Sequence, residues 1–316
     1  MTATARGLPQ KFRPSGDLIA DRRFSYAEAL AADGDLDAAA DLLMQVIERA
    51  PDWSAAWFRL GEVEARRGLN EAAADAFARA LALDPNDELG AALHLARLGA
   101  AAPPKVAPEA YVRSLFDQYA RSFDAHLVDT LSYRGPDLLL AAVKSLGERQ
   151  FAHAIDLGCG TGLGGAAFHA SAERLTGVDL SPSMVAAARA KGLYERLTVA
   201  TIEAFLAAEP PASADLLIAA DVLCYVGDLA PILKAARHVL AEGGYFAMTL
   251  QKGDEAFALA ADLRFAHSPA YLRESAVAQG FCVLFLEEAQ LRRDAGADVV
   301  GLVVVLRKDG RGPRGR

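Results

Sequence analysis

The chain has 316 residues, of which 53% are hydrophobic and 23% charged, a balance typical of globular proteins with a sizeable core. Its length predicts two domains, and its net charge of −8 argues against a broad surface for the phosphate backbone of nucleic acids. The sequence holds no apolar run of the roughly 18 residues that a membrane-spanning helix requires. Its three scattered cysteines lack the paired spacing of a metal site, which favours free thiols in a reducing, cytoplasmic compartment.

An internal repeat fills the first part of the chain. We expect residues 1–19 to form a flexible lead, because they lack the apolar core of a secretory signal. Over residues 20–98, a shift of 34 residues (68 − 34) superposes Gly34 on Gly68, and 34 is the period of tetratricopeptide repeats. The second unit also carries the motif residues Trp57, Leu60, Gly61, Ala73, Phe77, Ala80 and Pro85. This region resembles tetratricopeptide repeats, which implies a small all-α domain.

Each repeat is too small to bury its own apolar face, so the units must stack. Two full units are visible in the sequence, followed by a predicted capping helix, Glu88–Leu98. We expect so short an array to associate with itself, with a protein partner or with the following domain. Residues 99–109 predict a linker, because Pro103, Pro104 and Pro108 prevent a helix from continuing.

Residues 110–308 alternate predicted strands with helices. Amphipathic helices are expected at Tyr111–Leu127 and Pro136–Leu146. The predicted strands lie near residues 153–157, 174–178, 196–200, 215–220, 244–250, 281–287 and 298–306, and the later helices near 162–171, 182–191, 229–241 and 268–279. This alternation predicts an α/β, doubly wound parallel sheet. The arginine- and glycine-rich residues 309–316 predict a disordered basic tail.

The most informative motif follows the first of these strands. Asp156 ends the strand, and the glycines at 158, 160 and 162 form a loop before the next helix. Asp179 ends the second strand, 21 residues after the first glycine (179 − 158). Glycines let the backbone approach a ligand closely, and an acid at the next strand end accepts ribose hydroxyls. The pair predicts a nucleoside-bearing cofactor.

A nicotinamide dinucleotide is one candidate, because Gly160, Gly162 and Gly165 fit its fingerprint and Asp179 fits its ribose acid. Asp156 argues against it, since a carboxylate beside a pyrophosphate repels it but suits a cationic amino-acid group. Asp221, at the end of a fourth apolar strand, adds a further acid opposite the glycine loop.

The complete motif set resembles class I S-adenosylmethionine-dependent methyltransferases. It comprises Asp156–Gly162, Val178–Met184, Ala220–Leu223 and Leu240–Phe246. The resemblance implies a Rossmann-like sheet that ends in an antiparallel hairpin, with helices before the first strand covering the cofactor. It also implies S-adenosylmethionine as cofactor and S-adenosylhomocysteine as product. With the repeats, the chain resembles a bacterial group of predicted repeat-containing methyltransferases, from which no substrate follows.

The resemblance also implies cofactor-binding positions. Gly158, Cys159, Gly160 and Gly162 would make room for the methionine part, and Asp156 would hold its ammonium directly or through water. Asp179 would bind the ribose hydroxyls, and Asp221 would close the far side of the methionine pocket. The adenine would lie against Leu180 and Met184, with Thr201, Ile202 and Glu203 near its edge; among these three, the adenine-edge contact is left open between Thr201 and Glu203.

Tyr225, Arg264 and His267 are the candidate catalytic residues. Tyr225 lies four residues beyond Asp221 (225 − 221), and the other two precede a late helix whose loop faces the same cleft. His267 could instead cap or pack, and Arg264 could pair with an acidic substrate or merely lie in a solvated loop. Arg292 is a weaker candidate of the same kind as Arg264. A base is needed only if the acceptor is protonated at neutral pH. We expect no metal site.

These observations predict a methyltransferase that acts on a small or medium-sized acceptor, either free or bound to a carrier. The alternative is an interaction module in which a methyltransferase fold with weak catalysis accompanies repeats that bind a protein partner. Neither a membrane nor a nucleic acid is an expected partner.

Overall fold

A computed structural model describes residues 12–120, 123–124, 133–294 and 297–310. The chain divides between Ser114 and Leu115 into two compact units, each described by itself. The predicted basic tail beyond Gly310, most of the flexible lead and residues 121–122 and 125–127 of the first amphipathic helix lie outside the described residues. In the part that the structure describes, no helix is long and apolar enough to cross a membrane.

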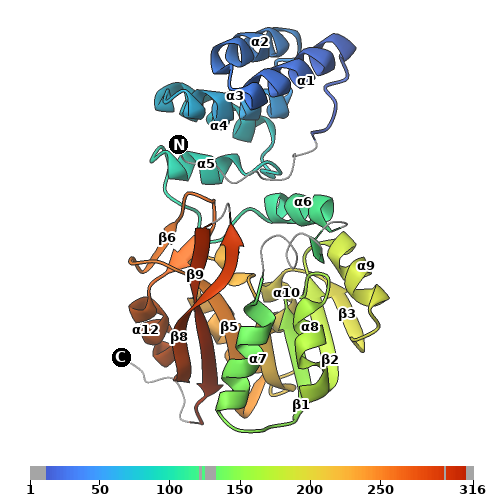
Figure 1. Cartoon of the computed structure of the whole chain (residues 1–316), viewed down its shortest axis with the longest axis vertical. Helices are drawn as coiled ribbons and strands as arrows, with labels where there is room; N and C mark the ends of the chain where they lie inside the picture. The colour runs from blue at the N-terminus through green and yellow to red at the C-terminus, as the bar shows by residue number, and fades with distance from the viewer. Residues whose placement is uncertain (1–11, 121–122, 125–132, 295–296, 311–316) are drawn as a thin grey trace. The chain divides into compact units, whose positions relative to one another are not determined.

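The first unit is built of helices, as predicted for the repeats (Figure 1). They are α1 (Leu18–Asp33), α2 (Leu36–Arg49), α3 (Ser54–Arg66), α4 (Asn70–Leu83) and the capping helix α5 (Ala91–Arg97). Local chemistry sets the ends of α1. The Asp17 carboxylate accepts the N–H groups of Ile19 and Ala20 at 2.8 and 3.0 Å, and Gly34 ends the helix at a left-handed φ of 90°.

Close packing joins the two helices of the second repeat. A Cβ placed on Gly61 of α3 would lie 2.8 Å from the Phe77 ring of α4, closer than carbon atoms approach. Phe77 is fully buried and also contacts the ring of Phe58. The glycine of the repeat motif is therefore required because the aromatic ring occupies the space of a side chain.

The second unit contains one nine-stranded sheet. Its path runs β3–β2–β1–β4–β5–β7–β6, and β9 pairs with both β5 and β8 in antiparallel fashion. The strands are β1 (Phe151–Leu157), β2 (Ala172–Asp179), β3 (Arg196–Val199), β4 (Ala214–Ala219), β5 (Leu240–Lys252), β6 (Phe257–Leu259), β7 (Phe265–His267), β8 (Phe281–Asp294) and β9 (Ala297–Lys308). The first five strands are parallel, so the predicted doubly wound sheet with a final hairpin is confirmed.

Helices cover both faces of this sheet. They are α7 (Gly135–Ser145), α8 (Leu163–Phe168), α9 (Pro182–Ala190), α10 (Ile202–Ala208), α11 (Ala230–Val239) and α12 (Pro269–Ala278), while α6 (Glu109–Tyr119) contains the division between the units. Two short 3₁₀ helices, η2 (His169–Ser171) and η3 (Leu223–Tyr225), complete the set in the described residues.

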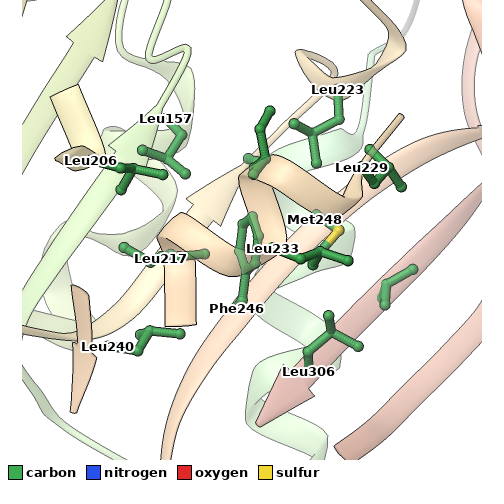
Figure 2. Close-up of a cluster of buried hydrophobic side chains, with 14 of the residues drawn as sticks. Leu157, Leu206, Leu217, Leu223, Leu229, Leu233, Leu240, Phe246, Met248 and Leu306 are labelled. Carbon is green, nitrogen blue, oxygen red and sulfur yellow. The ribbon is translucent and has the colours of Figure 1, made fainter. Parts of the chain in front are cut away.

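Alternate side chains of the strands feed two cores, because successive residues of a strand point to opposite faces. Leu216 of β4 packs in the core under α7 and α8. Its neighbour Leu217 packs in the core under α10, α11 and α12. Figure 2 shows part of the second core, where Leu217 and Phe246 of the sheet lie near Leu233 of α11. Because helices cover both faces of the sheet, a ligand site is expected at the carboxyl ends of its strands.

Four of the described elements were not predicted: β6, β7, α10 and the short 3₁₀ helix η3. The strands β6 and β7 have three residues each, too few for a periodic pattern. The helix α10 begins where Thr201 and Glu203 were interpreted as cofactor contacts only. Thr201 caps this helix, since its Oγ1 accepts the Ala204 N–H at 3.1 Å.

The Gly61 contact generates a prediction for stability. Changing Gly61→Val should lower the free energy of unfolding by about 1–3 kcal/mol, because the new side chain overlaps the Phe77 ring. Ala78→Val, on the exposed side of α4, adds methyl groups without this overlap and should cost less than about 1 kcal/mol. Urea unfolding of both variants measures the difference, and equal losses would contradict the packing argument.

Candidate functional site

The loop after β1 needs its glycines for two separate reasons. Gly158, Gly160 and Gly162 have φ values of 68°, 53° and 95°, a left-handed conformation that other residues adopt at a cost. A Cβ on Gly158 would also lie 2.4 Å from a methyl group of Val222, in the loop after β4. Backbone conformation and close packing therefore both require glycine here. The loop consequently presents backbone without side chains at residues 158, 160 and 162, a bare backbone edge at the carboxyl ends of the strands.

Asp179 ties this loop to the start of α9. Its carboxylate accepts the Gly160 N–H at 2.8 Å and the Ser181 N–H at 2.9 Å. The parallel register pairs Asp156 with Gly177, so the ends of β1 and β2 meet at one edge of the sheet. Asp179 is partly exposed, and its role toward ribose hydroxyls stays a prediction.

Asp156 is held from within the protein. It is 1% exposed, and the Tyr194 hydroxyl donates to its Oδ2 at 2.6 Å. The Gly165 N–H in turn donates to the Tyr194 oxygen at 3.1 Å. The Tyr194 ring fills the space that side chains would occupy at Gly162, Gly165 and Gly177. Tyr194 thus packs against the glycine loop and the Asp156 carboxylate. The contact of Asp156 with an ammonium group stays a prediction.

Sequence reasoning did not select Tyr194. The signal for it was the set of glycines at the start of α8 and on β2, which share one aromatic neighbour only in the folded structure.

The end of α6 contacts the start of α9. The Ser181 hydroxyl donates to the Asp117 carboxylate at 2.5 Å, and the Ser183 N–H donates to the same oxygen at 3.2 Å. Ser181 itself caps α9 by accepting the Met184 N–H at 3.1 Å. A carboxylate at a helix N-terminus is stabilised by the exposed N–H groups there.

Phe123 and Asp124 lie at the glycine loop. A Cβ on Gly160 would be 3.7 Å from the Phe123 ring, an ordinary contact distance. The Thr161 hydroxyl donates to Asp124, and Lys191 forms an ion pair with Asp124 at 2.8 Å. The expected covering of the site by the segment before β1 is therefore visible at these two residues.

Asp221 follows β4 in an unusual conformation. Its φ of 55° is rare for a residue with a side chain. Its N–H donates to Thr249 Oγ1 at 2.8 Å, and Arg292 Nη1 donates to both carboxylate oxygens at 3.1 and 3.2 Å. The Arg292 side chain is 4% exposed. This buried pair fixes the acid that the sequence assigned to the far side of the cofactor pocket.

Tyr225 and Arg264 lie beside this pair. The Arg264 guanidinium carbon is 5.7 Å from the centre of the Tyr225 ring, and its Nη1 is 3.6 Å from Asp221 Oδ2. The ring of Phe116 from α6 also contacts Tyr225, edge on, at 5.6 Å between centroids. The structure therefore brings two of the three candidate catalytic residues together with Asp221.

His267 has a different environment. It is 0% exposed on β7, and its Nε2 donates to the Gly227 carbonyl at 3.0 Å. Its ring also stacks on Tyr271. Burial lowers the pKa of the imidazole, which disfavours its charged form. In this position the imidazole supports the Gly227 backbone, and a catalytic role for it stays a prediction.

The remaining predicted cofactor residues fall into two groups. Leu180, Thr201, Ile202 and Glu203 are partly exposed at the ends of β2 and β3. Cys159 and Met184 are buried beneath them. The four partly exposed residues are placed to contact a ligand. The two buried residues support the backbone on which those four lie. In the described residues, no group of three or more His, Cys, Asp or Glu side chains has the arrangement of a metal site.

Family comparisons agree with these observations. Residues 155–248 match a family described as a methyltransferase domain. Residues 20–63 and 54–87 match two families of tetratricopeptide repeats. Both predicted resemblances are confirmed.

Two curated relatives are O-methyltransferases. The ubiquinone biosynthesis O-methyltransferase of Xylella fastidiosa is 36% identical over 113 residues, which cover 34% of this chain and 46% of the relative. The malonyl-[acyl-carrier protein] O-methyltransferase of Pseudescherichia vulneris is 33% identical over 138 residues, covering 44% and 52%. The chain therefore spans about half the length of the curated relatives it matches.

A solved structure shares the fold. The 1,6-didemethyltoxoflavin-N1-methyltransferase of Burkholderia thailandensis, solved with 1,6-didemethyltoxoflavin and S-adenosylhomocysteine, aligns with a TM-score of 0.52 and 21% identity. The alignment covers 66% of this chain and 93% of that one. At this identity the likeness establishes the fold.

The buried Asp156 generates a prediction on pH. Burial raises the pKa of its carboxyl from 3.8 to about 6, against the lowering effect of the Tyr194 hydrogen bond. Because its pKa is raised in the folded state, the protonated Asp156 carboxyl stabilises the fold. This contribution is complete below about pH 4 and is lost as the pH rises through about 6. Relative to Asp156→Asn, the free energy of unfolding should therefore fall by about 2–3 kcal/mol over this range. Urea unfolding at several pH values tests this, and a constant difference would contradict it.

Proposed function

We propose that this chain, in which tetratricopeptide repeats precede a class I methyltransferase domain, transfers a methyl group from S-adenosylmethionine to a small or carrier-bound acceptor. The observation that carries the proposal is the bare backbone edge of the glycine loop, tied by Asp179 to the next helix. The methyltransferase family match covers this loop, Asp179 and Asp221.

The residues at the strand ends fit this cofactor chemically. Asp179 offers a partly exposed carboxylate to the ribose hydroxyls, and Leu180 and Ile202 offer apolar surface to the adenine. The Asp156 carboxylate, when ionised, favours a cation at this edge of the sheet, while Arg292 compensates the charge of Asp221. When bound, the cofactor supplies a methyl group on a sulfonium, a leaving group that is already activated.

The protein then contributes mainly position. Phe116 contacts both Phe123 and Tyr225, and Phe123 lies beside the glycine loop. Holding two reactants in line is worth roughly 7–11 kcal/mol of the barrier. Arg264 contacts the Tyr225 ring of this aromatic group.

The curated relatives support an oxygen acceptor. Their names describe O-methylation in ubiquinone biosynthesis and of a malonyl group on acyl-carrier protein. We extend to this chain the O-methyl transfer that both share and leave the acceptor molecule open between a free and a carrier-bound compound.

The alternative is an interaction module with weak catalysis, in which the repeats bind a protein partner. The repeats motivate it, while the ordered glycine loop, Asp179 and the Asp221–Arg292 pair argue against it. Release of S-adenosylhomocysteine from S-adenosylmethionine in the presence of a cell extract would exclude it.

Cofactor binding is tested by calorimetry. Asp179→Ala should weaken the binding of S-adenosylmethionine by about 1–3 kcal/mol, because hydrogen-bonded partners lose their acceptor. Asp137→Ala, at an exposed position of α7, is the matched control and should bind as the unchanged chain does. An unchanged dissociation constant for Asp179→Ala in the folded protein would rule out the ribose role. Absence of any binding to the unchanged chain at millimolar cofactor would refute the proposed function.

Cutting the chain near Pro104 tests the role of the repeats. Every proposed cofactor residue lies after this point, so the fragment that keeps α6 should bind S-adenosylmethionine with unchanged affinity. If the repeats only hold a partner, turnover also survives; if they help to admit the acceptor, turnover falls. Loss of cofactor binding in a folded fragment would show that the repeats are part of the site.

A further inference from the structure

We propose that the methyl acceptor is a carboxylate attached to an apolar body, that the Arg264 guanidinium binds it, and that the product is a methyl ester. This inference rests on the proposed function and names its acceptor class. Three observations support it: the contacts around Arg264, the pairing of the neighbouring acids with Arg292, and the positions of the candidate bases.

A continuous row of contacts leads from the glycine loop to Arg264. The Phe123 ring lies at Gly160, and Phe123 and Phe116 contact each other edge on at 6.1 Å between centroids. Phe116 contacts Tyr225 at 5.6 Å, and Arg264 lies over the Tyr225 ring. Three aromatic rings therefore lie between the glycine loop and the guanidinium, as suits an acceptor whose apolar body carries a carboxylate.

Arg264 retains hydrogen-bonding capacity at this end. Its Nη1 is buried and has no hydrogen-bond partner in the structure as described. The nearest carboxylate oxygen, Asp221 Oδ2, is 3.6 Å away, beyond normal hydrogen-bond length. The side chain as a whole is 26% exposed, so a ligand reaches the guanidinium through its other atoms and not through the buried Nη1. A guanidinium presents a planar fork of donors that matches the two oxygens of a carboxylate.

The neighbouring acid is already compensated by another arginine. Asp221 accepts from the buried Arg292 at 3.1 and 3.2 Å. Asp262, the next acid, accepts the backbone N–H of Arg264 at 3.2 Å and faces Arg292 at 3.9 Å. Arg292 therefore pairs with both acids, which leaves the Arg264 guanidinium to attract an anionic acceptor.

The candidate bases also favour an acceptor that is already deprotonated. His267 is fully buried with its Nε2 bound to the Gly227 carbonyl, and the Asp221 carboxylate is bound by Arg292. A carboxylate has lost its proton at neutral pH and needs no base.

The transfer balances without a proton. A carboxylate oxygen forms a bond to the methyl carbon while the bond between that carbon and sulfur breaks, and its electron pair stays on sulfur. The anionic carboxylate becomes a neutral ester, and the sulfonium becomes a neutral thioether. Arg264 holds one carboxylate oxygen and leaves the other to react.

The binding test uses trans-cinnamate and its neutral counterpart cinnamyl alcohol. The full chain, saturated with S-adenosylhomocysteine, is titrated with each compound by calorimetry at pH 7.5. We expect cinnamate to bind more tightly than the alcohol. Arg264→Gln should weaken cinnamate binding about tenfold or more while leaving the alcohol and S-adenosylhomocysteine affinities unchanged. Arg264→Lys should restore part of the loss, since it keeps the charge without the fork.

Arg293→Gln is the matched control, because this neighbouring arginine of β8 is exposed and pairs with Asp298 at 3.5 Å. It should leave cinnamate binding unchanged. Equal affinity for cinnamate and the alcohol, or an unaltered cinnamate affinity in Arg264→Gln, overturns the carboxylate assignment.

The chemistry is tested with methyl-labelled S-adenosylmethionine and the small-molecule fraction of a cell extract. Methyl esters release volatile labelled methanol in base, whereas methyl ethers and N-methyl groups retain the label. Base-labile label that disappears in Arg264→Gln supports the inference. Label that is entirely base-stable overturns it and leaves the proposed function standing, while failure to bind S-adenosylmethionine removes the proposed function itself.

Discussion

Three carboxylates at one edge of a parallel sheet repel one another, and the structure around the site depends on how each charge is held. Asp156 is buried against the Tyr194 hydroxyl, Asp179 accepts two backbone N–H groups, and Asp221 is bound by Arg292. Each of these contacts also fixes a loop. The acids at this edge of the sheet therefore also determine the conformation of the surrounding backbone.

The acids are held by different kinds of group. The Arg292 side chain is 4% exposed, so removing Asp221 would strand a buried charge away from water. Asp179 is held instead by the backbone N–H groups of Gly160 and Ser181, and Ser181 is fully buried. The site therefore fixes Asp221 with a side-chain charge and Asp179 with backbone donors.

Local patterns in the sequence predicted the repeats, the order of the parallel strands, the glycine loop and the acids that end β1 and β2. Each of these depends on residues that are near one another in the chain. Tyr194 was missed because its partners come from β1, β2 and α8 and meet only through strand pairing. Arg292 was ranked low because its partner Asp221 lies 71 residues earlier. The short strands β6 and β7 gave no periodic signal, and Thr201 was interpreted as a ligand contact although it caps α10.

The distance in sequence between Asp221 and Arg292 has a consequence for synthesis. Arg292 lies on β8, which is held in the sheet through β9. On the ribosome the glycine loop, β1 and β2 therefore emerge long before the cation that binds both oxygens of Asp221. Until the hairpin of β8 and β9 has been made and paired with β5, Asp221 lacks this partner. The site is therefore completed only after β9 has been translated.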